Sequence, residues 1–229
     1  MSGFPRLTAV ADHAVLVEFA DAISDEAHSR VLALDQAIAR APMAGLRECV
    51  PAFVNLLVDF DPLATDHQTV SQALRVLLAQ AAAPERRPTQ REVLVCYEPP
   101  FAPDLPEVAR RTGLTPEAVI AAHLAGEYQV FLYGFAPGYA YLAGVPAPLH
   151  LDRKPAPVRG IAAGSVIIAG AQCLVTTLVM PTGWWIIGRS PTRILTGQAQ
   201  RPFLFDVGDR VAFRRVSAAD FDTAERANG

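Results

Sequence analysis

The sequence predicts two domains, an α+β domain followed by a mainly β, barrel-like domain. Strand and helix signals alternate up to about residue 82, and a polar stretch with two prolines and two arginines follows at 83–90. Beyond Glu127, short β-branched runs alternate with glycine and proline, which is typical of a closed or nearly closed barrel. The 229 residues are 51% hydrophobic and 19% charged, enough for a substantial core.

The first domain, residues 1–82, is expected to pack two helices on one face of a sheet. Ser24 can cap the first helix through its side-chain hydroxyl. Asp25 and Glu26 follow in the first turn, where the helix dipole favours anions. Asp66 can cap a second amphipathic helix that ends near Ala82. The expected strands are Ala14–Phe19, Leu46–Val50 and Phe53–Phe60.

Residues 83–90 are the expected linker, and residues 91–217 the expected barrel domain. Two short helices should follow a first strand in the barrel domain, one stopped by Gly113 and one begun by Thr115 and Pro116. Residues 218–229 are expected to be a frayed tail. The expected strands are Glu92–Tyr97, Tyr128–Tyr133, Ser165–Ala169, Cys173–Val179, Trp184–Ile187, Thr192–Leu195 and Asp209–Val216.

The composition argues against several classes of function. A formal charge of −3 gives no reason to expect nucleic acid or an anionic membrane as a partner. Three cysteines without a CxxC pair predict reduced thiols in the cytoplasm, and no apolar run is long enough to cross a membrane. His123 and His150 lack metal-ligand spacing, and no GxxxxGK[ST] phosphate loop is present.

The stretch from Tyr133 to Pro191 holds the candidate functional residues, because glycine, proline and aromatic residues recur there beside short β runs. Tyr139 and Tyr141 could present rings and hydroxyls to a ligand, although the glycines could equally serve a simple barrel corner. The full set of candidates for substrate or partner binding is Tyr133, Gly134, Phe135, Pro137, Gly138, Tyr139, Tyr141, Arg159, Gln172, Trp184 and Arg189.

Arg189 follows an apolar strand and could hold a carboxylate bidentately, or form a structural ion pair. Arg153 and Arg159 are weaker candidates for the same role. Gln172 could give an amide donor and acceptor to a small amide, or satisfy a turn.

Other residues favour structural roles. Trp184 is more often a core residue, whereas Trp185 on the opposite strand face is expected at an interface between subunits. Ser165 does not lie in a GxSxG elbow, and Cys173 has no obvious histidine nearby in sequence, so neither is expected to be a nucleophile.

With these segments placed, the chain resembles the family of 5-oxoprolinase B subunits. That family also holds subunit 1 of allophanate hydrolase and the Kip-type inhibitor of a sporulation histidine kinase. The resemblance spans nearly the whole chain and is most specific in its glycine-proline-aromatic block. The matching segments are Ala11–Phe19, Val50–Phe53, Asp61–Leu63, Gly134–Leu142, Ala163–Val166, Ile168–Gly170, Gln172, Gly183–Trp184 and Ile187–Arg189.

The resemblance implies an N-terminal α+β domain, a C-terminal cyclophilin-like barrel and a larger partner, the 5-oxoprolinase C subunit or its subunit 2 counterpart in allophanate hydrolase. It implies a heteromeric ATP-dependent hydrolase of a small amide or lactam, with 5-oxoproline first and allophanate second. ATP is then expected on a partner or shared across an interface. The chain departs from the family pattern at Pro157-Val158, Cys173–Thr177 and Met180–Gly183, within the candidate block.

Two alternatives remain open on these grounds. The same modules resemble the carboxyltransferase part of a biotin-dependent carboxylase. A binding protein that inhibits a histidine kinase through its barrel surface, without chemistry of its own, is the other. Under the leading hypothesis Tyr139, Tyr141, Gln172 and Arg189 form one cluster that orients the substrate, while the catalytic residues are unknown.

Overall fold

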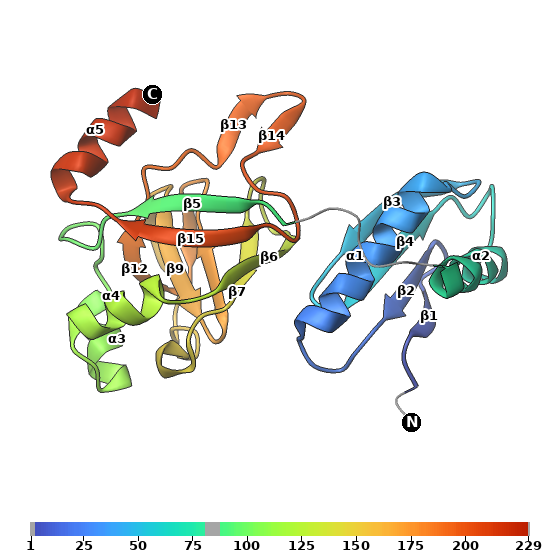
Figure 1. Cartoon of the computed structure of the whole chain (residues 1–229), viewed down its shortest axis with the longest axis horizontal. Coiled ribbons are helices and arrows are strands. Elements are labelled where there is room, and N and C mark those ends of the chain that lie inside the picture. The colour runs from blue at the N-terminus through green and yellow to red at the C-terminus, as the bar shows by residue number, and fades with distance from the viewer. Residues whose placement is uncertain (1–2, 81–87, 229) are drawn as a thin grey trace. The chain divides into compact units, whose positions relative to one another are not determined.

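The computed structural model describes residues 3–80 and 88–228, which divide into two compact units, Met1–Arg87 and Pro88–Gly229. Figure 1 shows the elements of both units. Most of the expected linker, residues 83–87, lies outside the described residues, and strand β5 begins at Gln90.

The first unit is a four-stranded antiparallel sheet with two helices against one core. The strand order is β1-β2-β4-β3, and the elements are β1 (Arg6–Val10), β2 (Ala14–Glu18), α1 (Asp25–Arg40), β3 (Leu46–Pro51), β4 (Asn55–Phe60) and α2 (His67–Gln80). Alternate residues of β4, among them Leu56 and Val58, are fully buried beside Leu34 of α1 and Leu74 of α2. This period of two is what a sheet covered on one face requires.

Side chains cap both helices of this unit as the sequence predicts. The Ser24 hydroxyl accepts a hydrogen bond from the amide of Ala27 at 3.1 Å. The Asp66 carboxylate accepts one from the amide of Thr69 at 2.7 Å. Each bond satisfies an amide that has no partner within its helix.

The second unit is built on a mostly β, nearly closed barrel, as expected. Seven strands follow the order β12-β9-β10-β7-β6-β15-β5. The strands are β5 (Gln90–Val95), β6 (Tyr128–Tyr133), β7 (Ala140–Ala143), β9 (Ser165–Ala169), β10 (Gln172–Val175), β12 (Trp185–Arg189) and β15 (Arg210–Arg215). All pairs are antiparallel except β15 with β5, which lie side by side in Figure 1.

The two outer strands of this sheet meet through a single bridge. Beyond the end of β5, Cys96 exchanges two backbone hydrogen bonds with Arg189 of β12, at 2.8 and 2.9 Å. Gly188 allows this approach, because a Cβ there would lie 2.7 Å from a methyl group of Val95 and 3.0 Å from the Cys96 carbonyl. Arg189 is therefore placed by the closure of the barrel.

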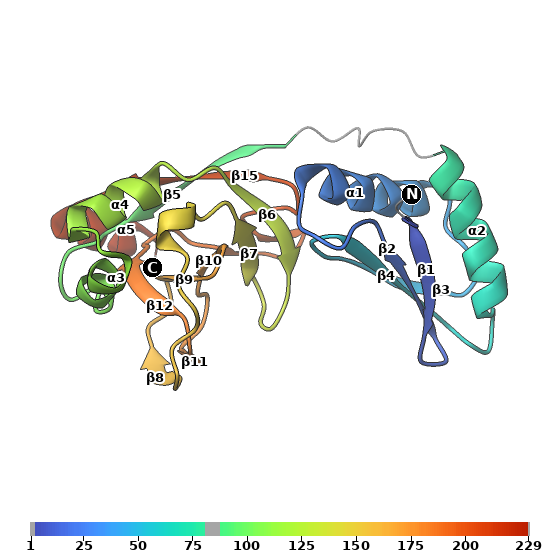
Figure 2. The ribbon, with the colours of Figure 1, turned by 90° about the horizontal axis from the view of Figure 1, so that it is seen from below.

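Smaller elements cover the barrel. Helices α3 (Leu105–Thr112) and α4 (Pro116–Leu124) lie together at one end. A separate two-stranded antiparallel sheet of β8 (Val158–Ile161) and β11 (Met180–Thr182) projects from the barrel (Figure 2). The others are the 3-10 turn η1 (Ala147–Leu149), the hairpin of β13 (Leu195–Gln198) and β14 (Arg201–Phe203), and helix α5 (Ala218–Asn228). Gly113 ends α3 and Thr115 caps α4, both as predicted.

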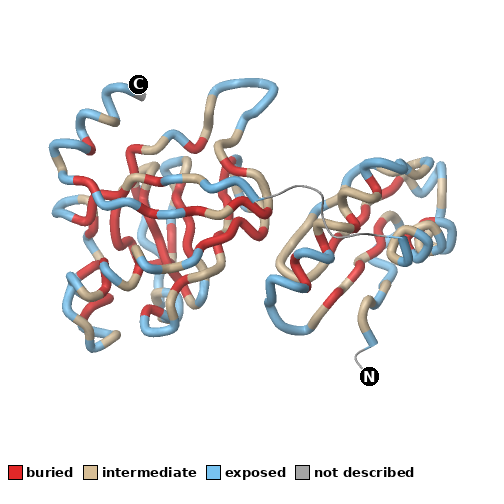
Figure 3. Tube along the Cα trace, in the orientation of Figure 1, coloured by how far each residue is buried: buried red, intermediate tan, exposed pale blue. Residues whose placement is uncertain are grey.

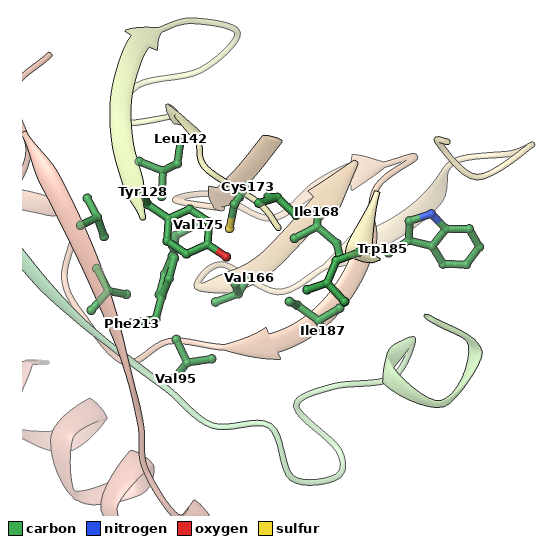
Figure 4. Packing of buried hydrophobic residues seen from close by; sticks show 14 of the residues in the cluster. Val95, Tyr128, Leu142, Val166, Ile168, Cys173, Val175, Trp185, Ile187 and Phe213 are labelled. Carbon is green, nitrogen blue, oxygen red and sulfur yellow. The ribbon is translucent and has the colours of Figure 1, made fainter. Parts of the chain in front are cut away.

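The barrel interior is filled by alternate residues of its strands. Figure 4 shows Val166 and Ile168 of β9 and Cys173 of β10 pointing into one cluster with Tyr128. The intervening residues, such as Ile167 and Leu174, face a second cluster on the outer side of the same strands. The barrel wall therefore has two apolar faces.

Two expectations about this unit are wrong. Residues 218–228 do not form a frayed tail, because α5 is a helix whose Phe221 is fully buried and whose other described residues are mostly exposed (Figure 3). Trp185 does not lie on an exposed face: it belongs to the interior cluster and its indole N–H donates to the Asp152 carbonyl at 2.8 Å.

Candidate functional site

The loop between β6 and β7 is held in a tight conformation. Phe135 and Gly138 both have positive φ, at 70° and 75°, and the Tyr139 amide donates to the Ala136 carbonyl at 3.1 Å. A Cβ on Gly138 would lie 2.7 Å from Leu195 Cδ2 and 3.0 Å from Thr177 Cγ2. Glycine is therefore required there by its backbone angle and by its neighbours.

A pocket of about 190 Å³ opens on one side of this loop; we call it the aromatic pocket. The Phe135 and Tyr139 ring centroids lie 5.7 Å apart, and those of Tyr141 and Trp184 lie 5.9 Å apart at an interplanar angle of 73°. The lining residues are Phe135, Tyr139, Tyr141, Arg153, Ile167, Leu174, Pro181, Thr182, Gly183 and Trp184.

The two tyrosines bring hydroxyl groups to this pocket. Within the described residues neither the Tyr139 nor the Tyr141 hydroxyl has a hydrogen-bond partner, whereas the Tyr133 hydroxyl donates to the Phe205 carbonyl at 2.8 Å. Desolvation raises the pKa of both Tyr139 and Tyr141. Both phenols therefore stay protonated at neutral pH and can each donate one hydrogen bond to a ligand.

Arg153 supplies the positive charge of the aromatic pocket. Its guanidinium carbon lies 5.7 Å from the centroid of the Trp184 ring, within range of a cation–π contact. A cation, two phenols and a flat indole face a cavity large enough for a small molecule. Such a set suits a small planar amide that also bears a negative charge.

A second depression, of about 490 Å³, shares no lining residue with the aromatic pocket; we call it the arginine groove. Thr177 joins the two regions, because it lines the groove and its hydroxyl donates to the Pro137 carbonyl at 2.6 Å. The lining residues are Ala163, Gly164, Thr176, Thr177, Arg189, Ser190, Pro191, Thr192, Arg193, Ile194, Leu195 and Glu225.

Arg189 lies in this groove and not with the tyrosines. Its Nε donates to the Ala163 carbonyl at 3.1 Å, and its Nη2 donates to the Glu225 carboxylate at 3.0 Å. The predicted single cluster is therefore split, because barrel closure fixes Arg189 opposite Cys96. In the aromatic pocket the arginine is Arg153, the weaker candidate of the sequence.

Other predicted site residues lie apart from both depressions. Gln172 is half-buried on β10, in register with Ala143 and Ala169, and lines neither cavity. Arg159 is exposed on β8 and also lines neither. Tyr133 stacks on Phe203, with centroids 5.0 Å apart. Gly134, Pro137 and Gly138 shape the loop itself.

The structure brings a histidine to Cys173, which the sequence does not reveal. His123 Nε2 lies 3.6 Å from Cys173 Sγ, and its Nδ1 lies 2.8 Å from the Tyr97 hydroxyl. Burial lowers the pKa of His123 to about 3 and raises that of the Cys173 thiol. The pair is therefore neutral and fully buried, which does not suit a nucleophile.

Two other features are absent from the described residues. Within them, no three histidine, cysteine or acidic side chains come together in a way that could hold a metal ion. Among the helices of the described ranges, none is both long and apolar enough to span a bilayer.

Comparison with known proteins shows the family to which this chain belongs. Residues 5–205 match the model of the carboxyltransferase domain, subdomain C and D. The B subunit of 5-oxoprolinase from Bacillus subtilis (strain 168) is 35% identical over 228 residues, which covers 94% of this chain and 95% of that protein.

Solved structures agree with this match. The crystal structure of TTHA0988 is 36% identical with a TM-score of 0.79, over 91% of this chain and 41% of that one. This chain thus spans less than half of the TTHA0988 chain. The Kluyveromyces lactis urea amidolyase, 15% identical with a TM-score of 0.80 over 97% of this chain and 15% of that one, shares the fold. The chain belongs to the family of carboxyltransferase domains, subdomain C and D, together with the B subunits of 5-oxoprolinase.

Proposed function

We propose that this chain is the B-type subunit of a heteromeric, ATP-dependent 5-oxoprolinase, which hydrolyses 5-oxoproline to glutamate. One observation carries the proposal. A pocket of about 190 Å³, with two unpartnered tyrosine hydroxyls and an arginine, lies in a chain 35% identical to a protein named as the B subunit of 5-oxoprolinase. A small lactam with one carboxylate matches this combination of groups.

In the aromatic pocket, each group has a role that its chemistry allows. Tyr139 and Tyr141 donate hydrogen bonds to the lactam carbonyl, because both phenols are protonated donors. Arg153 binds the ring carboxylate, since a guanidinium matches a carboxylate bidentately. The Trp184 ring gives the lactam ring a flat apolar wall. These residues bind and orient the substrate.

The phosphoryl chemistry is assigned to a C-type partner subunit, which holds ATP itself or shares it across an interface. The sequence holds no GxxxxGK[ST] loop that would cradle a triphosphate. Large apolar side chains around the loop favour a protein contact: Phe135 is 72% exposed and Val179 is 69% exposed. The 41% coverage of TTHA0988 agrees with a fold that works beside further polypeptide.

The test is an omission assay. The chain is co-purified with a C-type partner and a lactam-utilisation-type protein, and phosphate release is measured with and without 5-oxoproline. We expect 5-oxoproline-dependent release that disappears when this chain is left out. Turnover by the chain alone would contradict the partner requirement, and release that is indifferent to the chain would contradict its role in the complex.

The same assay separates the two amide substrates. Allophanate replaces 5-oxoproline at equal concentration, with the amidase-type neighbour present where the genes encode one. Release that depends on allophanate and not on 5-oxoproline would transfer the assignment to allophanate hydrolase subunit 1. 5-Oxoproline carries its carboxylate on a ring. We favour it because the aromatic pocket has one cation for the carboxylate and aromatic rings to pack against the lactam ring.

A further inference from the structure

Helix α5 places a carboxylate in the arginine groove. Glu225 lines the groove, and its Oε1 lies 3.0 Å from Arg189 Nη2. The family match ends at residue 205, so α5 lies outside the matched residues. The function proposed above assigns no role to this groove or to Glu225.

The Arg189 guanidinium has N–H donors left over for an anion. Phe101 and Phe221 pack against each other beside it, with ring centroids 6.0 and 5.3 Å from its Cζ. Its two side-chain hydrogen bonds use two of five N–H donors. Arg193 lines the same groove, and its Nε donates to the Leu195 carbonyl at 3.0 Å.

Helix α5 is held on the barrel mainly by one side chain, at a distance along the helix from Glu225. Phe221 is its one fully buried side chain among the described residues, packed against Phe101 at a centroid distance of 4.4 Å. The Glu225 side chain is half exposed, and an ion pair at such a site contributes little to stability. A competing carboxylate can therefore displace Glu225 at small cost.

We propose that the arginine groove is a binding site for a small carboxylate, and that Glu225 of α5 occupies Arg189 as a removable internal carboxylate. When the ligand carboxylate binds Arg189, Glu225 leaves and the end of α5 is released from the groove. The site is distinct from the aromatic pocket, so it does not depend on 5-oxoproline being the substrate.

The test is an NMR titration of the full chain, which follows the Arg189 Nε–H signal and the α5 amides. The probes are glutarate, its uncharged diamide glutaramide and inorganic phosphate. The variants are Glu225→Gln, Arg189→Lys and the control Glu117→Gln, since Glu117 also pairs with an arginine, Arg215, but lies on α4 outside the groove.

We expect glutarate to shift Arg189 Nε–H and the α5 amides, and glutaramide to leave both unchanged. Glu225→Gln should bind glutarate about two- to five-fold more tightly, because the internal competitor is gone. Arg189→Lys should weaken glutarate binding by at least about two- to five-fold, because a lysine cannot bind a carboxylate through two parallel hydrogen bonds. Glu117→Gln should behave like the wild type.

Three results would overturn the proposal. Equal glutarate affinity in the wild type and in Glu225→Gln, even with α5 loosened, would mean that the ion pair only fastens the helix. Absence of any Arg189 shift in both proteins would remove the site. Phosphate binding as tightly as glutarate would refute the carboxylate preference. Each result stands whether or not the omission assay finds 5-oxoproline turnover.

Discussion

The hydroxyl of Tyr141 is expected to contribute to substrate binding in the aromatic pocket. Tyr141→Phe keeps the ring beside Trp184 but removes a donor that has no partner in the described chain. We expect KM for 5-oxoproline to rise about ten-fold in the reconstituted complex, the equivalent of one lost hydrogen bond.

The matched control is Tyr133→Phe, which removes a hydroxyl bonded to the Phe205 carbonyl outside the pocket. This variant should lose some stability and keep its KM. If both variants change KM alike, the pocket assignment is wrong.

Gly164 lies at the rim of the arginine groove, with φ at +81°, and a Cβ there would lie 2.4 Å from the Ser190 carbonyl oxygen. Gly164→Ala should therefore cost more than the roughly 1 kcal/mol of an unfavourable backbone angle alone. Gly113→Ala measures that angle alone, because φ is +71° and nothing lies within 4 Å of the added Cβ.

Urea unfolding of both variants gives the comparison. A free energy of unfolding that falls equally in the two would show that the Ser190 contact relaxes without cost.

At the scale of elements, α5 depends on one side chain. Phe221→Ala removes the ring that packs on Phe101 and flanks Arg189. We expect the docking of α5 to weaken by about 3 kcal/mol, as for a buried phenylalanine, while the barrel stays folded. Hydrogen exchange should then accelerate in Ala218–Asn228 and remain slow in β6. Acceleration throughout the barrel would mean that α5 is part of the folding unit.

The sequence contains a signal for α5 that its polar composition obscures. Ser217 and Asp220 form a capping pair, in which the Asp220 amide donates to the Ser217 hydroxyl at 3.1 Å. The caps at Ser24, Asp66 and Thr115 are recognisable because apolar runs follow them, whereas α5 buries only Phe221 fully. Local chemistry thus predicts helix starts well when an amphipathic pattern supports them.

For the whole molecule, the sequence does not reveal which strands and helices that are far apart along the chain come into contact. Strands separated by glycine and proline predict the barrel, and the aromatic side chains of the pocket are among the candidates of the sequence. The separation of Arg189 from Tyr141 and the contact of His123 with Cys173 are not predictable in this way, because both depend on which strands and helices meet. Trp185 likewise is buried because α3 covers it, with Arg111 Cζ 4.8 Å from its ring.

The buried His123 makes the barrel unit sensitive to acid. Burial lowers its pKa to about 3 in the folded chain, whereas the unfolded chain takes up a proton near 6.5. This contribution to stability is complete above pH 6.5 and is lost as the pH falls toward 3. Its slope is at most about 1.4 kcal/mol per pH unit.

Tryptophan fluorescence reports this unit, since both tryptophans of the chain lie in it. Urea unfolding at pH 7, 6 and 5 should show a smaller loss of stability in His123→Gln than in the wild type. Parallel curves would show that other groups cause the acid sensitivity.

We propose that the loop between β6 and β7 and the strands beside it form a recognition surface that another polypeptide completes. Hydrogen–deuterium exchange of the chain, with and without the C-type partner and 5-oxoproline, tests it most directly. We expect slower exchange in residues 134–141 and 176–184 in the complex. Unchanged exchange in both segments, within a complex that hydrolyses 5-oxoproline, would contradict it.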